Sequence, residues 1–132
     1  MIIGYNKEWK QETNIGKVNN QKFIQIPYLK LIHQLLYKCK LEGINVIIQE
    51  ESYTSKSSFI DNDFIPTFKS TTALNYKFSG KRVKRGLYKS LSGMVINADL
   101  NGSLNILKKA VPNAFDECYG IEVCSTPKVI TL

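Results

Sequence analysis

The sequence predicts an α/β domain in which short strands alternate with helices. A helical pattern over residues 27–43 lies between two short apolar runs, residues 1–5 and 44–51. A second helical pattern, over residues 97–112, follows a long irregular segment. A helix followed so closely by an apolar strand is typical of a crossover onto a sheet buried on both faces. We interpret the order strand, helix, strand, insertion, helix as the second half of an α/β domain, and we expect its first half to be missing.

The first strand and the first helix are separated by a polar connection over residues 6–26. The helix opens at Pro27, because proline is tolerated in a first helical turn, and it ends near Gly43, a residue type common at helix C-termini. His33 lies beside the apolar face of this helix, and we interpret it as structural. The apolar face itself consists of Leu29, Ile32, Leu35, Leu36 and Cys39.

The second strand, INVIIQEE, is rich in β-branched residues and ends in two carboxylates. Residues 56–96 carry several glycine and proline turn points and form the predicted insertion. The last helix ends at Pro112, and the tail, residues 113–132, closes on a strand-like stretch, KVITL. The core stripe predicted for the last helix consists of Leu100, Leu104, Leu107 and Val111.

Length, charge and cysteine content limit the class of protein. A chain of 132 residues has room for one domain, and no apolar run approaches the roughly 18–20 residues that a membrane span needs. No signal-peptide pattern is visible at the N-terminus, so we expect a cytoplasmic protein without a membrane partner. Cys39, Cys118 and Cys124 form no CxxC pair, which argues against zinc and thiol chemistry. The net charge of +7 favours a polyanionic partner, usually a nucleic acid.

Three acids at the ends of predicted elements are the candidates for chemistry. Glu50 and Glu51 end the second strand, and Asp99 lies near the first turn of the last helix. Such acids most often belong to a polar rim, and helix dipoles favour them at N-termini, so a structural role stays open. The alternative is an oxygen-rich pocket, since asparagines and small residues surround Asp99, and such a pocket suits Mg²⁺.

Three stretches carry a resemblance to a known family: EESYTSKSSFID, FSGKRVKRGLYKS and INADLNGSLNILKKAVPNAF. Together they resemble the C-terminal part of TnpB (OrfB), transposon-encoded proteins long described as transposases, over about residues 1–115. Members of that family are RNA-guided DNA endonucleases with a RuvC nuclease domain of RNase H-like fold. The resemblance implies that residues 1–132 are one partial RuvC-like domain, its C-terminal half, with DNA and guide RNA as partners.

The resemblance also implies roles for the acids. In the family, three carboxylates hold two divalent metal ions, and Asp99 matches the last of them in a DxN motif. The strand that bears the middle glutamate corresponds to MIIGYN, which has no acid, so we expect a relocated ligand from the neighbouring strand. Successive strand residues point to opposite faces, and we favour Glu51 with Glu50 as second choice. The first aspartate is expected upstream of Met1, which predicts a weak or absent Mg²⁺ site and no cleavage by the isolated chain.

Relatives carry a zinc ribbon in the insertion, built from two CxxC pairs. Ser58 and Asp61 stand at the first pair, and Lys89 and Ser92 at the second, so zinc lacks its sulfur or imidazole ligands. The resemblance therefore implies a degenerate, cysteine-free, ribbon-like β-hairpin within residues 56–96, without zinc. We expect its core to consist of Phe59, Phe64, Phe68, Phe78, Leu87 and Tyr88.

The insertion also contains a dense basic run with Phe78 and Tyr88 interleaved. Charge runs are usually solvated, but the resemblance implies phosphate contact with the guide-RNA/DNA heteroduplex or with a single strand. The cations concerned are Lys77, Lys81, Arg82, Lys84, Arg85 and Lys89. The competing interpretation is a non-catalytic DNA- or RNA-binding or assembly module. A further prediction is a two-fold dimer, because residues 1–5 leave an apolar strand edge uncovered.

Overall fold

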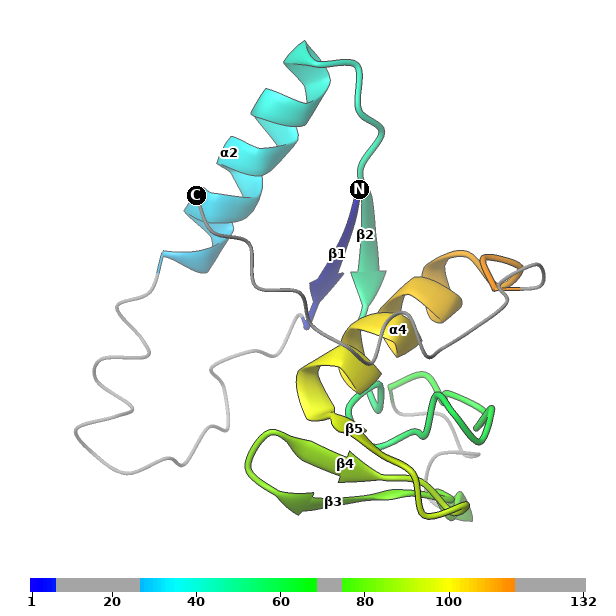
Figure 1. Ribbon diagram of the computed structural model, residues 1–132. Helices are drawn as coiled ribbons and strands as arrows, with labels where there is room; N and C mark the ends of the chain where they lie inside the picture. The colour runs from blue at the N-terminus through cyan, green and yellow to red at the C-terminus, as the bar shows by residue number, and fades with distance from the viewer. Residues whose placement is uncertain (7–26, 69–74, 116–132) are drawn as a thin grey trace, which may run out of the picture. The chain divides into compact units, whose positions relative to one another are not determined.

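The structure is a computed structural model that describes residues 1–6, 27–68 and 75–115 (Figure 1). Cys118, Cys124, the strand-like stretch KVITL and almost all of the polar connection lie outside the described residues. The chain forms two compact units, residues 1–50 and residues 51–132. Helices and strands occur in both, so the predicted α/β class is confirmed. No helix in the described part of the chain is long and apolar enough to cross a membrane.

The first unit is built on two parallel strands, β1 (Ile2–Tyr5) and β2 (Ile47–Glu50). Ile2 lies opposite Ile47 and Tyr5 opposite Glu50, so the two predicted strands are indeed neighbours. The connection between them contains helix α2 (Tyr28–Leu41). The Tyr28 hydroxyl donates a hydrogen bond of 2.8 Å to the Gly4 carbonyl, and its ring stacks on Tyr5. This aromatic contact fixes the start of α2 against the end of β1.

Helix α2 buries a narrower face than its sequence predicts. Ile32 and Cys39 are buried, whereas Leu29, also predicted to lie on the apolar face, is 57% exposed. Gly43 has a φ of +65°, the left-handed conformation that ends the helix, as expected from the sequence. The prediction of a strand buried on both faces is wrong for Ile47 and Ile48, which are exposed. In the described residues β2 has β1 as its one paired neighbour, and burial of both faces needs other segments packed on each side of the sheet.

The second unit contains a three-stranded antiparallel sheet and a helix (Figure 1). Strands β3 (Lys81–Lys84), β4 (Leu87–Lys89) and β5 (Val95–Asn97) lie in that order, and α4 (Ala98–Ala110) begins directly after β5. The β3–β4 turn contains Gly86, whose φ of +77° suits glycine. Where the sequence predicts a short hairpin, the structure therefore places a sheet of three strands.

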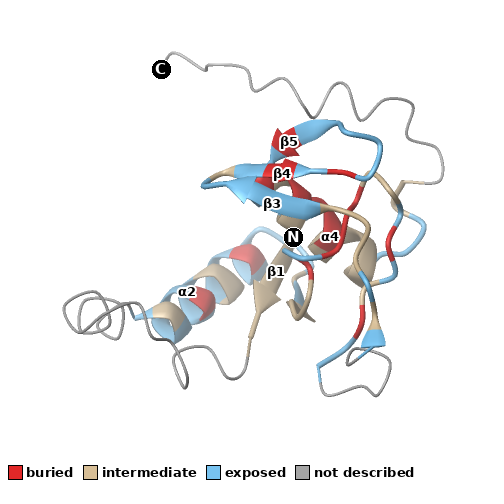
Figure 2. Cartoon of the chain, turned by 90° about the horizontal axis from the view of Figure 1, so that it is seen from below, coloured by how far each residue is buried: buried red, intermediate tan, exposed pale blue. Residues whose placement is uncertain are grey.

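The core of this unit lies between the sheet and the helix, where Figure 2 shows buried residues on β4, β5 and α4. Tyr88, Ile96 and Ala98 form it, with Ile60 packed against them. Gly80 passes so close to Tyr88 that a Cβ there would lie 2.5 Å from the ring.

Three of the six predicted core residues are exposed, which corrects the sequence prediction: Phe64, Phe68 and Leu87. Leu87 adjoins Tyr88 in β4, and neighbouring strand residues point to opposite faces, so the two cannot share one core.

Candidate metal and nucleic-acid site

Asp99 lies in the first turn of α4, where the end of the sheet passes into the helix. The Asn97 side chain caps the helix by accepting hydrogen bonds from the backbone N–H groups of Asp99, at 2.8 Å, and Leu100, at 3.1 Å. The Asp99 side chain is 89% exposed, and its Oδ1 lies 3.8 Å from Arg82 Nη2. The cap therefore fixes the backbone of Asp99 while its carboxylate stays accessible from solvent beside β3.

Glu50 and Glu51 fall on either side of a structural boundary. Strand β2 ends at Glu50, in the first unit, and Glu51 opens the turn that begins the second. The prediction that the strand extends to Glu51 is thus wrong, because the Glu51 carbonyl is hydrogen-bonded within the turn. That carbonyl accepts hydrogen bonds from the N–H and the hydroxyl of Thr54. Alternation of strand faces consequently no longer decides which glutamate faces a metal.

The donor chemistry of these acids fits Mg²⁺. Magnesium takes oxygen ligands and usually binds one or two carboxylates, completing its shell with water and phosphate oxygens. Asp99 offers such an oxygen to solvent, and Glu51 belongs to the same unit. Within the described ranges, no three His, Cys, Asp or Glu side chains gather closely enough to hold a metal ion. The magnesium site therefore stays a prediction, with Asp99 and Glu51 as its ligands.

The basic run lies on the outside of the sheet, next to Asp99. Lys81 is opposite Lys89 across β3 and β4, and both are exposed. The end of the β3–β4 hairpin is joined to the start of α4, since the Ala98 N–H donates a hydrogen bond of 2.8 Å to the Gly86 carbonyl. All six predicted phosphate-binding cations are exposed: Lys77, Lys81, Arg82, Lys84, Arg85 and Lys89. The fold thus brings Arg82 and the end of the hairpin at Gly86 to the helix end that carries Asp99.

A network of carboxylates and hydroxyls occupies the first of the two CxxC positions and reaches the second. Ser58 Oγ bonds Asp61 Oδ2 at 2.5 Å, and the same carboxylate accepts the Leu91 N–H at 2.8 Å. Asp63, which the sequence did not single out, accepts the backbone N–H groups of Ser58 and Ser79 and the Ser79 hydroxyl. We call Asp61 and Asp63 the aspartate node. These groups lack the thiolate or imidazole ligands that zinc prefers, so their chemistry does not fit a zinc site.

Two asparagines of α4, which the sequence places near Asp99 as part of an oxygen-rich pocket, are buried in the structure, and this burial was not predicted. Asn101 and Asn105 are fully buried and hydrogen-bond to the segment between Thr54 and Phe59. Their spacing of four residues puts them on one helix face, close to the leucines of the predicted stripe. The signal that could have found their burial is their position, since each directly follows a leucine of the stripe and the two lie four residues apart.

The model of the Cas12f1-like TNB domain family matches residues 28–106, more than half of the chain. This chain belongs to the Cas12f1-like TNB domain family. The family is related to the TnpB and Cas12 proteins, which confirms the resemblance to TnpB in this broader form. No curated protein and no solved structure is similar enough to the chain to count as a match. The TNB match includes both glutamates, the basic hairpin and Asp99.

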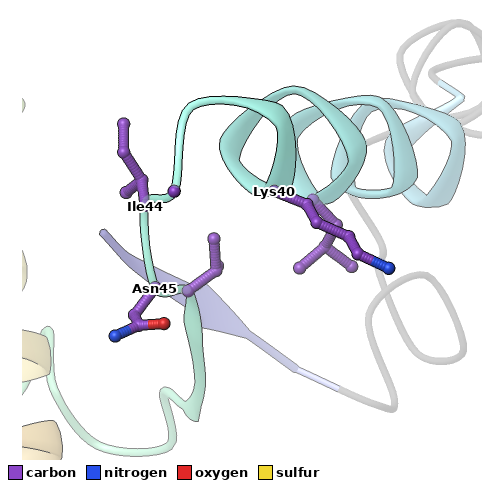
Figure 3. Close-up of a pocket in the computed structure, with 6 residues that line it drawn as sticks. Lys40, Ile44 and Asn45 are labelled. Atoms are coloured by element: carbon purple, nitrogen blue, oxygen red, sulfur yellow. The ribbon is translucent and has the colours of Figure 1, made fainter.

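The TNB match also covers an open hollow of about 370 Å³ in the first unit, at the C-terminal end of α2 (Figure 3). No carboxylate lines it, and none of the candidate site residues takes part. Its walls are formed by Leu36, Lys40, Gly43, Ile44, Asn45 and Val46. We assign it no part in the chemistry.

Proposed function

We propose that the chain is the C-terminal RuvC part of a transposon-encoded, RNA-guided, Mg²⁺-dependent DNA endonuclease of the TnpB type. The family match supports this proposal because it spans both the basic hairpin and Asp99. The observation that carries it is the contact between Arg82 and Asp99, which places one cation of the basic hairpin beside an accessible acid. Cations that neutralise phosphates next to a carboxylate are what a phosphodiester-cleaving site requires.

Each part of the site has its own task in this proposal. Asp99 and Glu51 would hold Mg²⁺, with Glu50 as the second candidate for the glutamate. The bound metal would supply an activated water and charge stabilisation at the scissile phosphate. Arg82 Nη2 lies 3.8 Å from Asp99 Oδ1, and this exposed side chain would be within reach of a phosphate held at Asp99. The remaining hairpin cations bind the nucleic-acid backbone without reading its bases.

Binding to nucleic acid is tested by removing three hairpin charges at once, through Lys81→Ala, Lys84→Ala and Arg85→Ala. We expect weaker binding to single-stranded DNA and RNA, with the slope of log K against log salt reduced by roughly 2, at about 0.7 per lost contact. A matched control removes three exposed charges from α2, namely Lys30, Lys38 and Lys40. Equal losses in both variants, or no loss in the hairpin variant, would exclude the hairpin as the specific contact surface.

A non-catalytic nucleic-acid-binding module is the second candidate, since the exposed hairpin cations alone would serve that role. The two functions differ in their dependence on Asp99. Because we expect no cleavage by the isolated chain, the test uses the chain joined to the segment of a TnpB protein that carries the first aspartate. Cleavage of DNA by this fusion that requires Mg²⁺ and disappears in Asp99→Ala supports the nuclease. Salt-dependent binding without cleavage by the fusion, unchanged in Asp99→Ala, supports the binding module.

A further inference from the structure

Helix α4 buries two amide side chains where a helix of this kind normally buries leucine. Asn101 and Asn105 have 0% exposure, while Leu104 between them is 8% exposed. Burial of an amide is unfavourable unless hydrogen bonds replace those to water. Buried amides of this kind are therefore expected to hold specific hydrogen-bond partners in place.

The two amides bind backbone groups of one loop rather than one another. Asn101 both donates and accepts a hydrogen bond. Its Nδ2 donates to the Ser57 carbonyl at 2.8 Å, and its Oδ1 accepts from the Phe59 N–H at 3.0 Å. Asn105 Nδ2 donates to the Thr54 carbonyl at 2.9 Å and to the Ser57 carbonyl at 2.7 Å. We call Asn101 and Asn105, with these partners, the asparagine clamp.

The clamp continues to Glu51 through Thr54. The Thr54 hydroxyl donates to the Glu51 carbonyl at 2.7 Å, and the Thr54 N–H donates to it at 3.2 Å. Lys109, one turn beyond Asn105, donates to the Ser52 carbonyl at 3.3 Å. The turn that begins at Glu51 is therefore tied along its length to α4.

The other end of the clamp leads to Asp99, two residues before Asn101 on the same helix. The Asn97 cap fixes the first turn, so the backbone at Asp99 and the clamp belong to one rigid helix. Asn105 Oδ1 has no hydrogen-bond partner in the described part of the protein, although it is buried. The side-chain hydrogen bonds of Asn105 that the structure describes are therefore all made by its Nδ2 group, to the Thr54 and Ser57 carbonyls of the turn.

We propose that Asn101 and Asn105 are positioning residues that hold the Glu51 turn against the helix bearing Asp99. This inference rests on the proposed metal role of Glu51 and Asp99. The asparagines do not touch the metal. They set the relative placement of two backbone segments whose side chains must converge on one ion, in the way that outer-shell hydrogen bonds orient metal ligands.

The test is a titration of the whole chain with Mn²⁺, a paramagnetic substitute for Mg²⁺, followed by amide NMR. In the wild type, we expect amides near Glu51 and near Asp99 to broaden at the same Mn²⁺ concentration. In Asn105→Ala that concentration should rise roughly ten-fold, and the two groups of amides should no longer broaden together. Thr54→Val keeps the side-chain shape, removes only the hydroxyl contact to Glu51, and should shift affinity less in the same direction.

Ile96→Val is the control, because it weakens the buried sheet core without touching the clamp. A common shift in Asn105→Ala and Ile96→Val would show general loosening and overturn the positioning role, leaving the metal role intact. Absence of broadening at Glu51 and Asp99 in the wild type would overturn the metal role, and the positioning role with it. If Asn105→Ala does not fold, Thr54→Val decides: unchanged affinity there overturns the proposal, and a selective decrease relative to Ile96→Val supports it.

Discussion

Tyr88 shows how one side chain joins core packing to polar contacts. Its ring lies in the core with Ile96, while its hydroxyl donates a hydrogen bond of 2.7 Å to the Lys56 carbonyl. Burial raises the pKa of Tyr88 to about 12, and the nearby negative charge of Asp63 adds to the shift. The phenol must therefore stay protonated for the second unit to keep this packing.

The raised pKa of Tyr88 predicts a loss of stability in alkaline solution. The unfolded tyrosine loses its proton near pH 10, while the folded one keeps it to about pH 12, so the stabilising difference is complete below pH 10. As pH rises from 10 to 12, the free energy of unfolding should fall by about 2–3 kcal/mol. Tyr88→Phe should be less stable at neutral pH by about 1 kcal/mol but should lack this decrease.

Urea unfolding of both proteins between pH 7 and pH 11.5 measures the effect. Lys108, whose pKa is lowered by burial, titrates in both proteins, so the difference between their stability curves isolates Tyr88. Parallel curves for the two proteins over the alkaline range would contradict the prediction.

The two helices were predictable because their apolar residues recur at helical spacing. The contacts within the insertion were not predictable. The helical spacing of apolar residues located α2 and α4 to within a few residues. The same reasoning misjudged burial at Leu29 and missed the buried Asn101, because periodicity reports hydrophobicity and not hydrogen bonding. The aspartate node was equally hidden, since it joins segments far apart in the sequence.

The aspartate node predicts that the insertion folds without metal. Asp63 alone accepts three hydrogen bonds and is 4% exposed, so Asp63→Ala leaves three donors without an acceptor. We expect this change to lower the free energy of unfolding by roughly 2–4 kcal/mol. Asp99→Ala, at an exposed acid, should change stability by no more than about 0.5 kcal/mol.

Thermal unfolding by circular dichroism, with and without EDTA, tests both parts of this prediction. The midpoint of the wild type should be unaffected by EDTA or by added zinc. A lower midpoint in EDTA, together with stoichiometric zinc in the purified protein, would show that the insertion holds a metal after all.

At the scale of the whole molecule, the two units differ in how far they bury their apolar side chains. The second unit closes a core of its own around Tyr88, whereas the described part of the first unit leaves Ile47 and Ile48 exposed on a two-stranded sheet. The sequence predicted both strands, since β-branched runs identify strands well. It could not predict their exposure, because burial depends on which segments pack on the sheet and not on the strands themselves.

The exposed sheet of the first unit predicts self-association. Strand β1 pairs with β2 along one edge, and in the described residues its other edge has no paired strand. An open edge with apolar side chains is a template for pairing with a second chain, most simply about a two-fold axis. We therefore expect a dimer in light scattering at micromolar concentration, formed through Ile2 and Ile3.

A charge on the edge strand should prevent this pairing, so Ile3→Lys should scatter as a monomer, with circular dichroism used to show that it remains folded. Leu41→Lys introduces the same charge at an apolar position of α2 that is 65% exposed, and it should leave the dimer intact. Dissociation by both variants would indicate a general effect of charge and not a specific edge. A monomeric wild type would rule out association through β1. A dimer that survives Ile3→Lys would rule it out as well, because the added ammonium group would then lie away from the contact.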